Sequence, residues 1–88
     1  MGKKLLMFYG TECVHCHAML PDVEKLEKEL KVNVEKKEVW HNIKNLNDMR
    51  KVDKGVCTAV PYFFNEKTGN GICGAVPYAI LKKWAKGK

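Results

Sequence analysis

The sequence lacks any apolar run long enough to cross a bilayer. Its first such run, Leu5-Leu6-Met7-Phe8-Tyr9, has about five residues, whereas a membrane helix needs roughly 20. Lysines precede this run, as in a signal peptide, but no small-residue cleavage site follows it. We therefore expect a soluble chain in the cytoplasm, with no membrane among its partners.

Arginine is nearly absent. Arg50 is the only arginine among the 16 basic residues, although the net charge is +6. Nucleic-acid-binding proteins usually gather arginine and aromatic side chains on one face, and here lysines are spread along the chain instead. We expect a solvated, lysine-rich surface and no nucleic-acid partner, while the charge can still steer the protein towards acidic proteins.

Internal repeats, linkers and low-complexity segments are also missing. The 88 residues suit one domain rather than two, and a chain of this length has a small core. We therefore expect residues 1–88 to form a single domain that acts as a monomer.

Hydrophobic spacing predicts alternating strands and helices in the first half. Residues 3–9 predict a first strand, because they contain the short, unbroken apolar run Leu5–Tyr9, which is typical of a buried strand in a parallel sheet. Residues 13–30 carry apolar side chains at steps of four, three and four, which indicates an amphipathic helix. Residues 32–39 predict a second strand. Asn42 or Asn45 can cap a second helix, whose expected apolar positions are Ile43, Leu46, Met49 and Val52.

The second half predicts a hairpin and a last helix. Residues 60–64 form an aromatic strand, with Pro61 at its start because proline cannot donate within a ladder. Residues 65–71 favour a hairpin turn, and residues 71–73 a return strand. Pro77 suits the first turn of the last helix, whose expected apolar face is Val76, Ile80, Leu81 and Trp84. We expect Trp40 and Trp84 to be packing residues in the interior rather than a platform for substrate. The order β-α-β-α-β-β-α implies an α/β fold with a mixed sheet.

Cys13 and Cys16 lie where the first strand leads into the first helix. At a helix N-terminus, backbone N–H groups and the macrodipole favour an anion, so the pKa of the Cys13 thiol falls below its ordinary value. We predict that Cys13 is the nucleophile of a dithiol–disulfide centre and that Cys16, more buried, resolves the mixed disulfide. His15 either stabilises the Cys13 thiolate or is an exposed residue without a role, and we expect His17 to face solvent.

Three segments resemble the thioredoxin and glutaredoxin superfamily: residues 8–21 with the C-x-x-C pair and a later proline, Val60-Pro61 before an aromatic strand, and Gly74 after the last strand. The resemblance covers nearly the whole chain. It implies a thioredoxin-like fold, with a four-stranded mixed sheet flanked by three helices, and a protein disulfide oxidoreductase without metal or cofactor. It also implies a cis Val60–Pro61 bond and a substrate-binding role for Val60, Pro61 and Gly74. The partners would be protein disulfides and a reductase that the sequence does not identify.

Three positions depart from the patterns of these proteins. Thioredoxins have a buried aspartate six residues before the first cysteine, and Met7 stands there. Glutaredoxins usually have a lysine where Thr11 stands, and the segment after Cys73 lacks the second glycine and the acid that hold glutathione. The sequence therefore predicts a minimal thioredoxin-like oxidoreductase that uses glutathione poorly.

Cys57 and Cys73 have several possible roles. We expect two buried, unpaired cysteines that the exchange reaction does not need, because Cys13 and Cys16 already supply both thiols. The alternatives are a disulfide, which a cytosolic protein disfavours, an auxiliary redox pair, or a thiolate metal site together with Cys13 and Cys16.

Two other functions fit some of the same residues. The segment Cys13-Val14-His15-Cys16-His17 satisfies the C-x-x-C-H attachment pattern of c-type haem, with His17 as axial ligand and Met49 as distal candidate. Four cysteines and three histidines would also suffice for a tetrahedral zinc site, but the paired C-x-x-C spacing is missing. The strands expected before Cys13 and after Pro61, and the lack of an export signal, favour the oxidoreductase over the haem protein, and the missing spacing favours it over the zinc site.

Overall fold

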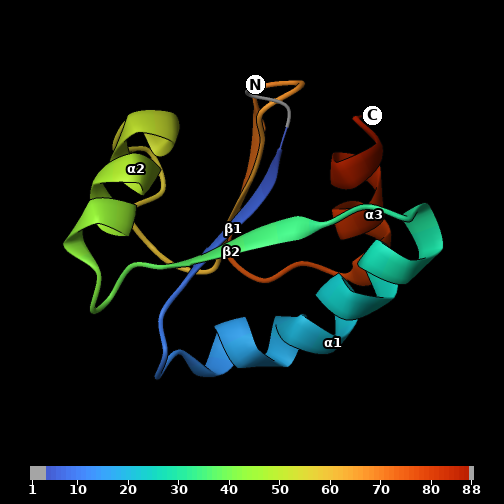
Figure 1. Cartoon of the computed structure of the whole chain (residues 1–88), viewed down its shortest axis with the longest axis horizontal. Helices are drawn as coiled ribbons and strands as arrows, with labels where there is room; N and C mark the ends of the chain where they lie inside the picture. The colour runs from blue at the N-terminus through green and yellow to red at the C-terminus, as the bar shows by residue number, and fades with distance from the viewer. Residues whose placement is uncertain (1–3, 88) are drawn as a thin grey trace.

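The computed structural model describes residues 4–87, in which a single sheet carries helices on both faces (Figure 1). The elements are β1 (Leu5–Tyr9), α1 (Val14–Leu30), β2 (Val34–Glu38), α2 (Ile43–Asp53), β3 (Tyr62–Asn65), β4 (Asn70–Cys73) and α3 (Tyr78–Lys86). This is the predicted order. Lys3, which we included in the first strand, lies outside the described residues.

The four strands lie in the order β2-β1-β3-β4. β1 pairs in parallel with β2 and antiparallel with β3, and β3 pairs antiparallel with β4. A parallel neighbour needs a crossover, which α1 supplies, whereas the β3–β4 hairpin needs only a short turn. The sheet is mixed, as predicted. Its hairpin turn is shorter than predicted, because Asn65 already pairs with Asn70.

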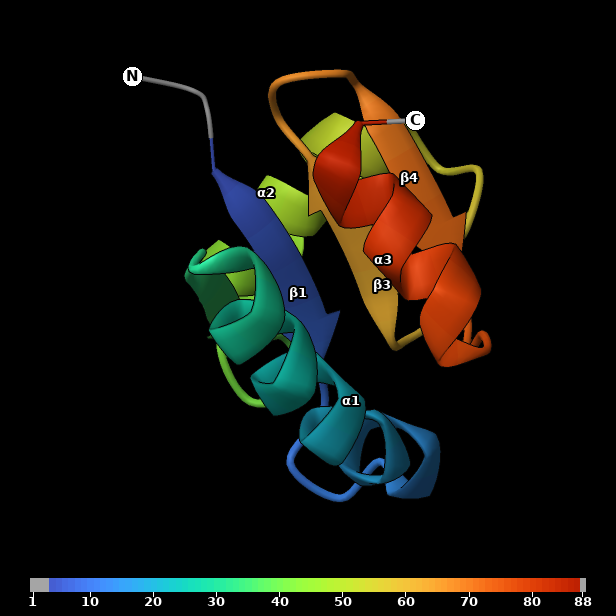
Figure 2. The ribbon, with the colours of Figure 1, turned by 90° about the vertical axis from the view of Figure 1, so that its right-hand side faces the viewer.

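The central strand β1 is buried on both faces. Leu5 and Met7 pack on the face covered by α1 and α3, whereas Leu6 and Phe8 pack on the face covered by α2. Figure 2 shows α1 and α3 side by side in front of the sheet, and Figure 1 shows α2 on the opposite side. Since neighbouring side chains of a strand point to opposite faces, burial on both faces explains the unbroken apolar run.

Each face of the sheet carries its own hydrophobic core. The first core lies between the sheet, α1 and α3, and includes Met7, Cys13, Cys16, Val23, Phe63 and Trp84. The second core lies between the sheet and α2, and consists of Leu6, Phe8, Val39, Met49 and Tyr62. Val60 is half-buried and packs against both cores.

Local signals set the helix ends. The side chain of Asn42 accepts the N–H of Asn45 at 3.0 Å, so Asn42, one of the two candidates, caps α2. Lys31 ends α1 in the left-handed conformation, with its N–H bonded to Glu27. Pro21 lies inside α1 and cannot donate to the preceding turn. Figure 1 shows that the axis of α1 bends part-way along its length.

Three side chains expected in the interior are exposed. Ile43 is 69% exposed because it is the first residue of α2, and Ile80 is 44% exposed at the edge of the buried stripe of α3. Trp40 is 52% exposed, in the segment between β2 and α2. Trp84 is buried as predicted and packs edge-on against Phe63.

No helix within residues 4–87 is long and apolar enough to cross a membrane.

Candidate active site

Cys13 is the N-cap residue of α1. Its backbone is extended, and its Sγ atom accepts the N–H of Cys16 at 3.1 Å. The Cys13 N–H is bonded to the Gly10 carbonyl at 3.0 Å, and no acidic residue lies in the first turn of α1. A thiolate at this Sγ would keep its N–H donor and lie at the positive end of the helix dipole. The geometry therefore favours an ionised Cys13 in the reduced protein.

Cys13 and Cys16 form a disulfide, with their Cα atoms 5.2 Å apart. Cys13 is 6% exposed and Cys16 is 1% exposed, so Cys16 is the more buried, as predicted. Both belong to the first core, together with the fully buried Met7. An incoming thiolate would therefore attack Cys13 and displace the Cys16 sulfur.

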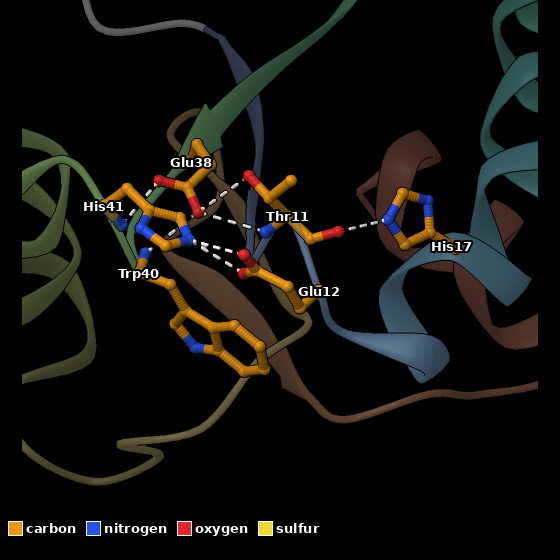
Figure 3. A network of polar contacts seen from close by, with 6 residues as sticks. All are labelled: Thr11, Glu12, His17, Glu38, Trp40 and His41. Atoms are coloured by element: carbon orange, nitrogen blue, oxygen red, sulfur yellow. Dashed lines mark hydrogen bonds and ion pairs between the residues drawn. The ribbon is translucent and has the colours of Figure 1, made fainter.

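The two histidines of the motif lie on the exposed side of α1. The Nε2–H of His17 donates to the Thr11 carbonyl (Figure 3), so this exposed side chain also fixes the preceding loop. The His15 side chain makes no hydrogen bond to any of residues 4–87. Its influence on the Cys13 thiolate stays a prediction.

Glu38, the last residue of β2, organises the loop before Cys13 (Figure 3). Its Oε2 atom accepts the Thr11 N–H at 3.0 Å and the Thr11 hydroxyl at 3.1 Å, and also the Trp40 N–H at 3.2 Å. Its Oε1 atom accepts the His41 N–H at 2.8 Å. Partial burial opposes ionisation of this carboxyl, but the hydrogen bonds from His41 and Thr11 lower its pKa overall.

His41 and Glu12 form an ion pair beside this network. The His41 Nε2 atom lies 2.8 Å from Glu12 Oε1, and the hydrogen bond and charge of Glu12 raise the pKa of His41 above 6.5. Glu12 directly precedes Cys13 in the sequence, so the pair joins the active-site loop to the segment after β2. Sequence reasoning missed Glu12, Glu38 and His41. Only the parallel register, which places Tyr9 opposite Glu38, brings these segments together.

The residues expected to bind substrate lie together next to the first core. The Val60–Pro61 bond is cis, as expected. The Pro61 carbonyl accepts the Gly74 N–H at 2.8 Å, and Gly74 has a φ of +94°, which favours glycine. Val60 packs against the first core, which contains Cys13 and Cys16.

A cavity of about 400 Å³ lies between α2 and the segment that leads to Val60. Its walls are mostly apolar and include Trp40, Met49 and Val60, with Arg50 and Lys54 also among the lining residues. We expected Trp40 to be interior, and it forms one wall of this cavity instead. Its indole covers Gly10, whose lack of a side chain leaves room for the ring.

Cys57 and Cys73 form a second disulfide, with Cα atoms 5.6 Å apart. Cys57 is half-buried and Cys73 is exposed, so the expectation of two buried, unpaired thiols is wrong. The two cysteines meet because Tyr62 pairs with Cys73 in the hairpin and only four residues separate Tyr62 from Cys57, so Cys57 lies close to the same strand. Within residues 4–87, no three Cys, His, Asp or Glu side chains are grouped as a metal ion would need.

The comparisons with known proteins bear on the fold. A scan against protein-family models finds no match, and a search of curated proteins finds none. Among solved structures, the crystal structure of thioredoxin from Aeropyrum pernix matches with a TM-score of 0.74 and 23% sequence identity. The match covers 97% of this chain and 73% of that chain. The chain has a thioredoxin-like fold.

In this fold, Cys13 and Cys16 lie at the start of α1, and their sulfur atoms form a disulfide. A haem attached through thioether bonds would need both thiols, and an axial His17 would need the Nε2 atom that bonds to Thr11. The arrangement of the motif therefore favours thiol exchange over haem attachment.

Proposed function

We propose that the chain is a protein thiol–disulfide oxidoreductase. The observation that carries this proposal is the position of Cys13, which caps α1, accepts an N–H at its sulfur and pairs with Cys16. The partners in the proposal are disulfide-bearing proteins and a separate reductase. The protein acts as a monomer, without metal or cofactor, in the cytoplasm, where a reductase can keep the pair reduced.

The reaction is a pair of thiol–disulfide exchanges. In the reduced protein, the Cys13 thiolate attacks one sulfur of a substrate disulfide, forms a mixed disulfide and expels the other substrate sulfur as a thiolate. The Cys16 thiol then loses its proton, attacks the Cys13 sulfur and releases the second substrate thiolate. The substrate gains two electrons, which Cys13 and Cys16 lose. Of the two protons that its thiolates take up, one is the proton lost by Cys16 and the other comes from the solvent, which received it when Cys13 ionised.

Substrate binding is assigned to the backbone around Val60. An extended substrate segment would pair with Val60, which packs against the core that contains Cys13, and the Pro61–Gly74 hydrogen bond joins that loop to the end of β4. The net charge of +6 favours encounters with acidic substrate proteins. His15, exposed in the first turn of α1, is assigned to stabilising the Cys13 thiolate.

Reduction of insulin disulfides with dithiothreitol tests the function. We expect the wild type to accelerate the reaction and Cys13→Ser to abolish the acceleration, because the nucleophile is lost. Cys16→Ser is the matched variant: it keeps the nucleophile and should accumulate a mixed disulfide that mass spectrometry detects. Full activity of Cys13→Ser would contradict the proposal.

A further inference from the structure

The loop that carries Val60 is held at both ends by one residue, Cys73. At one end, the disulfide joins Cys73 to Cys57. At the other end, Tyr62 pairs with Cys73 in the β3–β4 ladder. Residues 58–61 form the short arc between these two attachments, and Val60 and Pro61 lie in it. Reduction of the Cys57–Cys73 disulfide would therefore release one end of the proposed substrate-binding loop.

Few other contacts fix the entry to this loop. The Asp53 carboxylate accepts the N–H of Gly55 at 2.8 Å and that of Thr58 at 3.2 Å. Val56 is exposed, and Thr58 has a φ of +59°, a conformation uncommon for a residue with a branched side chain. The Val56 N–H also bonds to the Asp53 carbonyl at 2.9 Å, and Cys57 and Val60 pack against the second core. The other residues of the segment are exposed. Because segments with little buried apolar contact open at low free-energy cost, the disulfide is one of the main constraints on residues 54–60.

The disulfide is accessible to an external thiol. Cys57 and Cys73 both line an open cavity of about 440 Å³, and Lys54 and the mostly buried Asp53 are also among its lining residues. Cys73 is exposed, so its sulfur is the one that an incoming thiolate can attack, and the Lys54 ammonium favours the approach of an anion. The Cys57 sulfur lies 3.3 Å from the Ala59 carbonyl oxygen. The Cys57 thiol formed by reduction therefore has an acceptor in place.

We propose that Cys57–Cys73 is a second, reducible site whose redox state controls substrate binding at the first site. The reductant is a dithiol. Its thiolate attacks the Cys73 sulfur, forms a mixed disulfide and releases Cys57, which takes up a proton. The second thiol of the reductant then attacks the reductant's own sulfur and frees Cys73 as a thiol. One disulfide in the protein is reduced, and two thiols of the reductant become a disulfide.

The consequence for binding follows from the ordering of the loop. This step rests on the proposed function, in which the Val60 backbone pairs with substrate. With the disulfide intact, residues 58–61 are already ordered. With it reduced, only a fraction of the molecules holds Val60 in the binding conformation, and the apparent affinity falls by that fraction. The exchange at Cys13 and Cys16 needs neither Cys57 nor Cys73, so KM rises several-fold while kcat stays unchanged.

A first experiment tests whether the second disulfide exchanges in the folded protein. The variant Cys13→Ser/Cys16→Ser retains only the second pair. It is incubated with increasing ratios of reduced to oxidised dithiothreitol, alkylated with iodoacetamide and examined by mass spectrometry. We expect Cys57 and Cys73 to become alkylated together while the circular dichroism spectrum stays native. Protection of the disulfide until the protein unfolds would overturn the proposal, as would free Cys57 and Cys73 thiols under oxidising conditions.

A second experiment tests the effect on the substrate loop. The insulin assay is run at a ratio of reduced to oxidised dithiothreitol that leaves Cys57–Cys73 oxidised in the first experiment. Cys57→Ser, Cys73→Ser and the double variant should then all show the same several-fold rise in KM for insulin over the wild type, because each removes the same bond, with kcat unchanged. Amide hydrogen exchange of the wild type should be faster in residues 54–60 with both pairs reduced than with both oxidised, and the matched Cys13→Ser/Cys16→Ser variant should show the same increase. An unchanged KM in all three variants, or unchanged exchange in residues 54–60, would overturn the proposal.

If instead the wild type does not reduce insulin at all, the proposed function fails. The alkylation and hydrogen-exchange results still decide whether the second disulfide is reducible and holds the loop.

Discussion

The indole of Trp40 covers Gly10, and a methyl group added at Gly10 would overlap the ring. Gly10 also accepts the Cys13 N–H through its carbonyl. The close approach of these two residues thus links one wall of the 400 Å³ cavity to the loop that precedes Cys13.

We expect Gly10→Ala to displace Trp40 and to lower the free energy of unfolding by about 1–3 kcal/mol, the usual cost of overpacking. In a Trp84→Phe background, the emission of Trp40 should shift to longer wavelength as the ring moves into water. Gly71→Ala is the matched control, because its added methyl group would meet Tyr62 instead. It should lose stability without shifting the emission, and equal spectra for the two variants would contradict the expected contact.

In the reduced protein, Cys13 should react with iodoacetamide well before Cys16 near neutral pH. The reason is the N–H donor at its sulfur together with its place at the head of α1. Peptide mass spectrometry after short exposures measures both rates. Faster labelling of Cys16 would contradict the assignment of Cys13 as nucleophile.

His15→Pro should make the reduction potential of the Cys13–Cys16 pair more negative, because a group that stabilises the thiolate is lost. Proline is tolerated in the first turn of a helix, where His15 lies. A shift of about 30 mV corresponds to about 1.4 kcal/mol for this two-electron couple, so equilibration with a dithiol of known potential measures it. An unchanged or less negative potential would exclude the role of His15.

The imidazole of His41 should titrate above its ordinary pKa of 6.5, and Glu12→Gln should lower its midpoint. A raised folded-state pKa means that the pair stabilises the protein below the pKa of the unfolded chain and that this stabilisation is lost as the pH rises through the folded value. The pair is exposed, so the effect on unfolding is small, and NMR titration of the ring is the suitable measurement. The same midpoint in both proteins would refute the pairing.

Glutathione should be a poor electron donor. Thr11 supplies no cation, and its N–H and hydroxyl are both bonded to Glu38, while Gly74-Ala75-Val76 offers no carboxylate. A glutathione-coupled assay with hydroxyethyl disulfide should give weak turnover, and a dithiol donor should serve better. Efficient glutathione-dependent turnover would contradict this expectation.

Local patterns were enough to predict the order of elements and the position of the Cys13–Cys16 pair at the start of α1. The apolar run before Cys13 and the spacing of Met19, Val23 and Leu26 after it depend only on neighbouring residues. The same holds for Pro61, whose missing N–H places it before β3 rather than inside it.

The contacts that the sequence did not reveal depend on which strand residues lie opposite one another and on where a loop brings the chain back to the sheet. Glu38 reaches Thr11 because β1 and β2 end side by side, 27 residues apart in the chain. Cys57 meets Cys73 because the chain turns back to the hairpin within four residues. Trp40 lies against Gly10 next to the cavity and stays partly exposed. The hydrophobic periodicity of the sequence does not reveal this contact between a tryptophan and a glycine.

In the proposed reaction, Met7 would affect how long the mixed disulfide with the substrate persists, and not how fast it forms. It is fully buried in the core that contains Cys16, and its thioether cannot accept the proton that the Cys16 thiol must lose before it attacks the mixed disulfide. That proton has to pass to water or to the departing substrate sulfur instead. We expect the covalent complex with substrate to dissociate slowly, and Met7→Asp to shorten its lifetime in a quenched-flow measurement. The chain would then hold each substrate for longer than a thioredoxin with an acid at this position.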